Sequence, residues 1–260
     1  MNDVINHYLD FIISLIAFAC MFVGALVGGF LRMRLPEDHL PSDSRDVVKL
    51  GAGLVATMAA LALGLLVSSA KNSFDSVNEG LTEASANRVN LDRILDHYGP
   101  GADIARDHLR HSLASDLERI WPKSNVTTQG ISLDESSTEL ETVGDILREL
   151  TPQNESQRLL KDRAIQIYGE GMKLRWSLIQ RTHVSIPTVL LVVLIFWFTV
   201  LFVTFGLLTS SNMAVNVVML VCALSVASGI FLILDMGRPF QGVFRISSAP
   251  VENALSHLGR

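Results

Sequence analysis

Residues 50–70 read LGAGLVATMAALALGLLVSSA, and this stretch decides the fold class. It holds about 21 residues without a single Asp, Glu, Lys, Arg or Pro, and about 20 apolar residues are enough for a helix to cross the hydrocarbon core of a bilayer. Ala and Leu, which favour helices, make up most of it. We therefore predict a transmembrane helix over residues 50–70.

Two further blocks, residues 11–31 and 182–234, also lack charged side chains. The second block is about 53 residues long, enough for two crossings, and the polar run 208–213 divides it into a helical hairpin. A hydrophobic content of 49% and a mean hydropathy of +0.36 agree with a membrane protein. The sequence thus predicts an all-α, four-span protein.

Four segments follow from these spans. Residues 1–71 hold spans 1 and 2, residues 72–182 form an inserted helical domain, residues 183–235 form the hairpin of spans 3 and 4, and residues 236–260 form an interfacial C-terminal segment. The first span lacks the basic flank of a secretory signal, because Asp3 and Asp10 precede it. Cys20 and Cys222 both lie in apolar blocks, so we expect no disulfide.

Basic residues near the spans bear on orientation, and they lie on both sides. The loop between spans 1 and 2 carries Arg32, Arg34, Arg45 and Lys49. The other side carries Lys71, Lys173, Arg175, Arg181, Arg238 and Arg245, whereas the hairpin tip carries no charge. Because cytoplasmic loops are enriched in Lys and Arg, the larger count places the inserted domain in the cytoplasm.

The inserted domain shows helical periodicity that continues from the second span. Apolar residues recur at spacings of three and four until Gly99-Pro100-Gly101, with one charged interruption at Arg88. The members of this seam are Phe74, Val77, Leu81, Ala84, Arg88, Leu91, Leu95 and Tyr98. Further helices are predicted at residues 103–121, 140–150 and 160–178, with a loop at 123–137. The seam either packs inside one subunit or joins several copies.

Motifs for catalysis are absent from the sequence. We find no HExxH, CxxC, P-loop, GxGxxG after a strand, or GxSxG pattern, so we expect no enzymatic activity, no cofactor and no metal site. The four predicted spans contain no charged residue of the kind that proton relays need, which leaves passive conduction or a non-conducting role. A net charge of −5 argues against a nucleic-acid partner.

One face of the second span collects small and hydroxylated side chains. At 100° per residue, this face carries Leu50, Gly53, Thr57, Leu61, Gly64, Ser68 and Lys71, and the opposite face carries Val55, Ala59, Ala62 and Leu66. Such a face can line a narrow water path, with Leu61 as a dewetting constriction. It can equally pack against the first span, where Gly24 and Gly28 form a GxxxG helix-packing motif.

The C-terminal segment also allows two interpretations. Phe240, Phe244 and Ile246 suit a membrane interface, and Arg238 and Arg245 suit lipid phosphate. Alternatively, Ser247 and Ser248 cap a helix over residues 249–258, with Pro250 in its first turn. The start of that helix beside Arg245 could then hold an anion.

Several of these runs resemble a bacterial membrane-protein family of unknown function described as bestrophin-like. The resemblance lies in GLVATMAAL (53–61), GLLV (64–67) and AKNSFD (70–75), and in a closing signature that comprises Asp235, Pro239, Phe240, Gly242, Arg245, Ser247, Ser248 and Pro250. Similar runs are RLPEDHL (34–40), LDR (91–93), HYGP (97–100) and CALS (222–225).

The resemblance implies kinship with bestrophins, which are homopentameric, passively conducting anion channels whose second helix lines the pore. It implies a bacterial inner-membrane location, and lipids, small ions and copies of the same chain as partners. Together with the face of the second span, it favours a homo-oligomeric channel, a pentamer as a first estimate. The competing hypothesis is a membrane scaffold or sensor whose cytoplasmic helices bind a partner.

Overall fold

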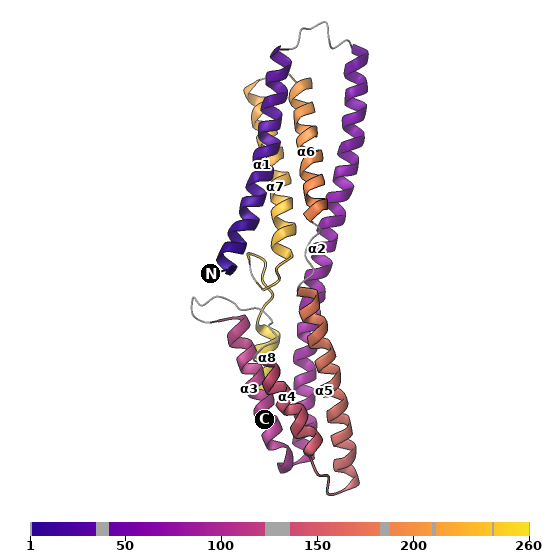
Figure 1. Cartoon of the computed structure of the whole chain (residues 1–260), viewed down its shortest axis with the longest axis vertical. Helices are drawn as coiled ribbons and strands as arrows, with labels where there is room; N and C mark the ends of the chain where they lie inside the picture. Colours follow the sequence, from indigo (N-terminus) through magenta and orange to yellow (C-terminus); the bar gives the residue numbers. More distant parts are fainter. Residues whose placement is uncertain are drawn as a thin grey trace. The chain divides into compact units, whose positions relative to one another are not determined.

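The computed structural model describes residues 2–34, 42–122, 136–182, 188–209, 212–240 and 242–259. Within these ranges every regular element is a helix (Figure 1), which confirms the all-α prediction. Most of the predicted loop at residues 123–137 and most of the run 34–40 lie outside the described residues.

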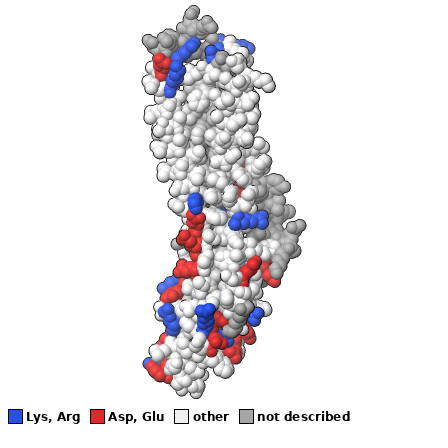
Figure 2. Space-filling model, turned by 180° about the vertical axis from the view of Figure 1, so that it is seen from behind, with Lys and Arg blue, Asp and Glu red and all other residues white. Residues whose placement is uncertain are grey.

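Four of the described helices are long and apolar enough to cross a membrane, as predicted. They are α1 (Asn2–Arg34), α2 (Ser42–Tyr98), α6 (Thr188–Leu208) and α7 (Met213–Met236). Helices α6 and α7 are apolar all round, which is typical of membrane spans. The face in Figure 2 shows a broad band of uncharged surface along the spans, whereas the inserted helices carry Lys, Arg, Asp and Glu together.

The chain divides into two compact units. The membrane unit comprises Asn2–Asn72 and Ser185–Gly237, and the inserted unit comprises Ser73–Val184 and Arg238–Arg260. Helix α2 belongs to both units, because no break separates its apolar half from its polar half. It ends at Gly99, whose φ of 101° is readily adopted only by glycine.

Two apolar clusters hold the membrane unit together. In the first, Ala17, Met21 and Ala25 of α1 pack against α6 and α7. In the second, Ala59, Leu66 and Ala70 of α2 pack against Leu194, Leu201 and Ile233. Helix α1 therefore contacts the α6–α7 hairpin through small residues, which let helix backbones approach closely in a membrane.

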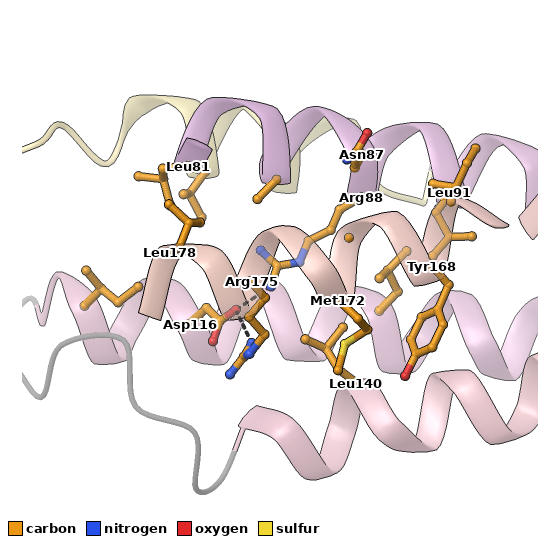
Figure 3. Close-up of a pocket in the computed structure, with 16 residues that line it drawn as sticks. Leu81, Asn87, Arg88, Leu91, Asp116, Leu140, Tyr168, Met172, Arg175 and Leu178 are labelled. Atoms are coloured by element: carbon orange, nitrogen blue, oxygen red, sulfur yellow. Dashed lines mark hydrogen bonds and ion pairs between the residues drawn. The ribbon is translucent and has the colours of Figure 1, made fainter. Parts of the chain in front are cut away.

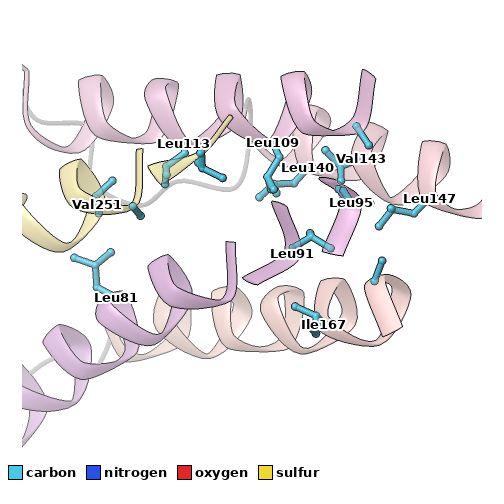
Figure 4. Close-up of a cluster of buried hydrophobic side chains, with 14 of the residues drawn as sticks. Leu81, Leu91, Leu95, Leu109, Leu113, Leu140, Val143, Leu147, Ile167 and Val251 are labelled. Atoms are coloured by element: carbon cyan, nitrogen blue, oxygen red, sulfur yellow. The ribbon is translucent and has the colours of Figure 1, made fainter. Parts of the chain in front are cut away.

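The inserted unit packs its helices around one apolar core (Figure 4). The C-terminal part of α2, from Ser73, packs in this core with η2 (Pro100–Ala102), α3 (Asp103–Ile120), α4 (Ser136–Glu149), α5 (Glu155–Thr182) and α8 (Ala249–His257). Val77, Leu81, Leu91, Leu95 and Tyr98 of the seam are at most 4% exposed in this core. The seam thus packs inside one subunit, which leaves little of its apolar surface for other copies.

An ion-pair cluster fixes the end of α2 to α3 and to the C-terminus. The Arg106 guanidinium donates to Asp92 at 2.9 Å and to Asp96 at 2.6 Å, and the Gly259 N–H donates to Asp92 at 3.1 Å. Asp92 is only 3% exposed. The hydrogen bond that Arg106 donates to Asp92, more than any other contact, raises the pKa of Arg106.

Two of the three residues assigned to a membrane interface are buried instead, whereas the third, Phe244, is 44% exposed. Phe240 and Ile246 are buried in the core of the inserted unit. The Ile246 N–H donates to the Pro239 carbonyl at 2.9 Å, and Ile246 accepts a bond from the Trp121 indole N–H at 3.0 Å. Phe240 and Ile246 therefore contribute to the apolar core of the inserted unit. Their burial keeps both side chains away from a membrane surface.

Helix α8 lies where the sequence predicted a C-terminal helix, but Ser248 does not cap it through its side chain. The Ser248 hydroxyl donates to Glu252 instead, at 2.7 Å, and the Ser247 hydroxyl accepts from the Ala249 N–H at 3.2 Å. Arg245 donates to the Gly242 carbonyl at 2.8 Å. Ser247 and Ser248 thus order the entry to the helix through local bonds.

Charged residues require two corrections. Asp10 and Asp235, at the edges of the charge-free blocks, lie within the spanning helices α1 and α7 and are 4% and 1% exposed. The spans are therefore not free of buried carboxylates. Arg175, which entered the orientation count, is buried in the inserted unit. It contributes to a core and not to a membrane-proximal surface, so five basic residues remain on that side.

Candidate functional site

The small-residue face of α2 is open in the structure of the single chain. Leu50 is 76% exposed and Leu61 is 65% exposed. Gly53, Thr57, Gly64 and Ser68 are exposed as well. A β-carbon added at Gly53 or Gly64 would meet no atom within 4 Å. No described part of the chain therefore covers this face.

The opposite face of α2 makes the contacts within the membrane unit. Ala59 and Leu66 are buried, and Val55 and Ala62 are partly buried in the same cluster. The two faces predicted from periodicity are therefore distinct in the structure, with one packed and one open. Packing of the small-residue face against the first span is not observed among the described residues.

The Thr57 hydroxyl on the open face bonds to its own helix. The Thr57 hydroxyl donates to the Gly53 carbonyl at 2.8 Å, one turn earlier. Such a bond satisfies a hydroxyl donor inside a membrane without a partner helix. The oxygen of Thr57 still has acceptor capacity toward water or a passing group. The face is therefore mildly polar even where no other helix contacts it.

Leu61 lies at the border between two kinds of exposed surface on α2. On its other side the projection places Leu54, Met58 and Leu65, which are 48–71% exposed. The exposed sides of α6 and α7 are also bulky and apolar, and they include Val192, Phe196, Val217 and Val221. Bulky apolar side chains suit contact with lipid tails. Helix α7 also exposes two hydroxyls, Ser225 and Ser228, each bonded to a carbonyl of its own helix.

Gly24 and Gly28 lie at the contact of α1 with α6. A β-carbon on Gly24 would come within 3.3 Å of the Thr199 carbonyl oxygen, and one on Gly28 would collide with the carbonyl oxygen of Val203. A β-carbon on Gly206 of α6 would likewise collide with the carbonyl oxygen of Ala25 on α1. The sequence marked the two glycines of α1 but missed Gly206, because no small-residue spacing around it indicates a partner.

Metal-binding clusters are not found among the described residues, since no group of three or more His, Cys, Asp or Glu side chains converges there. The open face presents glycine backbone, hydroxyls and leucine. Lys71 ends the face and is exposed.

The fold and this face define a helical membrane protein with two spans, an inserted helical unit and two further spans. The Bestrophin-like domain model matches residues 19–251, and the chain belongs to this family. A comparison with curated protein sequences found no match.

Solved structures share the fold over the whole chain. A point variant of a bacterial bestrophin homologue from Klebsiella pneumoniae aligns with 14% identity and a TM-score of 0.62, and the alignment covers 99% of this chain and 98% of that one. A second variant of that homologue aligns with 13% identity and a TM-score of 0.63 over the same shares. A crystal structure described as a membrane protein variant aligns with 12% identity and a TM-score of 0.60, with complete coverage of both chains.

Proposed function

We propose that the protein is a passive ion channel in which several copies surround a path lined by the open face of α2. The observation that carries this proposal is that Gly53 and Gly64 have open space above them while Ala59 and Leu66 pack. A face of glycines and hydroxyls that its own chain leaves uncovered is suited to a water path in an assembly. Family membership supports the same assignment.

The assembly is proposed as a homo-oligomer, with a pentamer as the first estimate from the bestrophin resemblance. One copy of α2 cannot enclose a path, so several must meet around one axis. In such a ring, Leu61 would form the narrowest apolar level, with Thr57 on one side and Gly64 and Ser68 on the other. Small anions are favoured over cations by the resemblance alone.

The membrane is proposed to be the bacterial inner membrane, with the inserted unit in the cytoplasm. After Arg175 is removed from the count, the inserted side still offers five basic residues against four in the loop between α1 and α2. The hairpin tip adds no charge to the loop side. The positive-inside tendency therefore still favours this orientation.

The competing hypothesis is a membrane scaffold that binds a partner through the inserted helices. The apolar seam of α2 would be one surface for such a partner, but Val77, Leu91 and Leu95 are buried inside the subunit and leave little of the seam for it. Ile104, Leu159 and Trp176 are exposed apolar residues of the inserted unit and could still serve such contacts.

The direct experiment combines native mass spectrometry with flux. Purified protein is reconstituted in liposomes, and the flux of chloride, nitrate, potassium and sodium is compared with that in protein-free liposomes. We expect oligomers in the mass spectrum and flux of at least one ion. A monomer in mild detergent, or assembled protein without flux of any of the four ions, would contradict the channel and favour the scaffold.

A further inference from the structure

A cavity of about 70 Å³ lies inside the inserted unit, apart from the face of α2 discussed above. Helices α2, α3, α4, α5 and α8 all contribute to its wall. Most of the wall is apolar, with Leu91, Leu140, Ile167, Met172 and Val251 among its members. Since one water needs about 10–15 Å³ by this measure, the space of about 70 Å³ suits roughly five to seven non-hydrogen atoms.

One part of the cavity wall is charged (Figure 3). Arg88 of α2 and Arg175 of α5 approach the same carboxylate oxygen of Asp116, at 2.7 Å and 3.7 Å. Arg88 makes this single bond with one of its nitrogens, and no other bond of Arg88 is found within the described ranges. A guanidinium carries five N–H donors, so Arg88 keeps donor capacity at the cavity wall.

Stability of the fold does not explain why position 88 in the seam is an arginine. Arg88 interrupts an otherwise apolar seam, and the ion pair it forms is only about 15% exposed. Replacing a buried ion pair with apolar residues of similar volume is often neutral or stabilising. A leucine at this position would complete the seam, so a charged donor here suggests a task beyond packing.

The electrostatic surroundings favour an added negative charge. Burial lowers the pKa of Arg175, and the positive charges of Arg88 and Arg119 act in the same direction, while Asp116 opposes them. The other titratable group that lines the cavity is Tyr168, whose pKa is raised chiefly by burial. An anion beside Arg88 would stabilise the positive charge of both guanidiniums, as Asp116 does.

We infer that this cavity binds a short-chain carboxylate, with its carboxylate at Arg88 and its alkyl chain against Leu91, Leu140 and Met172. An arginine fork matches a carboxylate in geometry and charge. The apolar wall suits two or three methylene groups and gives an inorganic ion nothing to bond with on its far side. This inference does not depend on conduction, because the site lies within the inserted unit of one chain.

The test measures binding by the detergent-purified full chain. Butyrate should raise the midpoint of thermal unfolding in a concentration-dependent way and give a saturable heat in calorimetric titration. Butyramide, which has the same size and no charge, should bind at least about tenfold more weakly, because charge-assisted bonds to Arg88 are lost. Chloride or sulfate producing the same shift as butyrate would overturn the carboxylate assignment.

Two variants locate the site. Arg88→Met should weaken butyrate binding at least about tenfold, whereas Arg148→Met, at an exposed surface ion pair, should leave it unchanged. Equal butyrate affinity in wild type and Arg88→Met would overturn the proposal.

A second pair of variants keeps every charge in place. Gly171 and Gly169 both lie on α5 with open space above them, and only Gly171 lines the cavity. Gly171→Leu should therefore block butyrate binding by filling the space, and Gly169→Leu should not. A wild-type protein that shows no butyrate effect, or a Gly171→Leu variant that still binds, would contradict the inference even if Arg88→Met fails to fold.

Discussion

The carbonyl oxygen of Val203 on α6 occupies the space that a β-carbon on Gly28 of α1 would need. Gly206 stands in the same relation to the carbonyl of Ala25, so the two helices approach each other backbone to backbone. Without a hydrophobic driving force inside the bilayer, such close approach is what holds spans together. The contact between α1 and α6 therefore contributes to the stability of the membrane unit.

Gly28→Ala should destabilise the membrane unit. The added methyl must push α6 away, and overpacking of this kind costs about 1–3 kcal/mol. We expect a lower thermal midpoint for the purified protein. Gly29→Ala is the matched control, since its nearest neighbour would lie at 3.9 Å, an ordinary contact distance. Equal midpoints for the two variants would contradict the packing role of Gly28.

Asp92→Asn should destabilise the inserted unit. It replaces one carboxylate oxygen with an amide NH2, so either Arg106 or the Gly259 N–H loses its acceptor and the negative charge of the buried pair is lost. Loss of one member of a buried ion pair costs on the order of 3 kcal/mol. The exposed Asp96→Asn should cost less than about 1 kcal/mol, because solvent screens that pair. Thermal unfolding of both variants measures the difference. A larger effect from Asp96→Asn would show that Asp92 does not carry the cluster.

Hydropathy and periodicity were sufficient for the helices and for the two faces of α2. Residues 50–70 predict a span with two distinct faces because side-chain order along a helix fixes which residues share a side. The sequence left open whether the small-residue face packs against the first span, and the structure shows it uncovered by the described residues. Contacts between distant segments could not be predicted in this way. Arg88 was visible as an interruption, but Asp116 lies 28 residues further along the chain and no pattern links the two.

The burial of residues near the C-terminus and at the edges of the spans also could not be predicted from the sequence. Phe240 and Ile246 have the composition of an interface, and only the fold shows that Trp121 contacts both of them. Asp10 and Asp235 stand at the ends of apolar blocks, where an exposed carboxylate is the simpler expectation. Their burial depends on how α1 and α7 extend beyond the hydrophobic runs, which composition does not specify.

Sidedness can be measured with a single cysteine. In a background with Cys20 and Cys222 replaced, a cysteine at Asp162, an exposed position on α5, should resist membrane-impermeant thiol reagents in intact cells and react in inverted vesicles. Ser124, in the predicted polar loop, is an equivalent choice by sequence and lies outside the described residues. Labelling from outside the cell would reverse the proposed orientation.

Leu61→Ser in reconstituted liposomes shows whether the open face of α2 lines an ion path. A ring of exposed Leu61 side chains would resist hydration, so serine should keep the path wet and raise ion flux above wild type. Leu224→Ser, at a 55% exposed leucine of α7, should leave flux near wild type, and Leu66→Ser should lower stability because Leu66 is buried. Flux through assembled Leu61→Ser protein that stays at the level of protein-free liposomes would contradict a pore lined by α2.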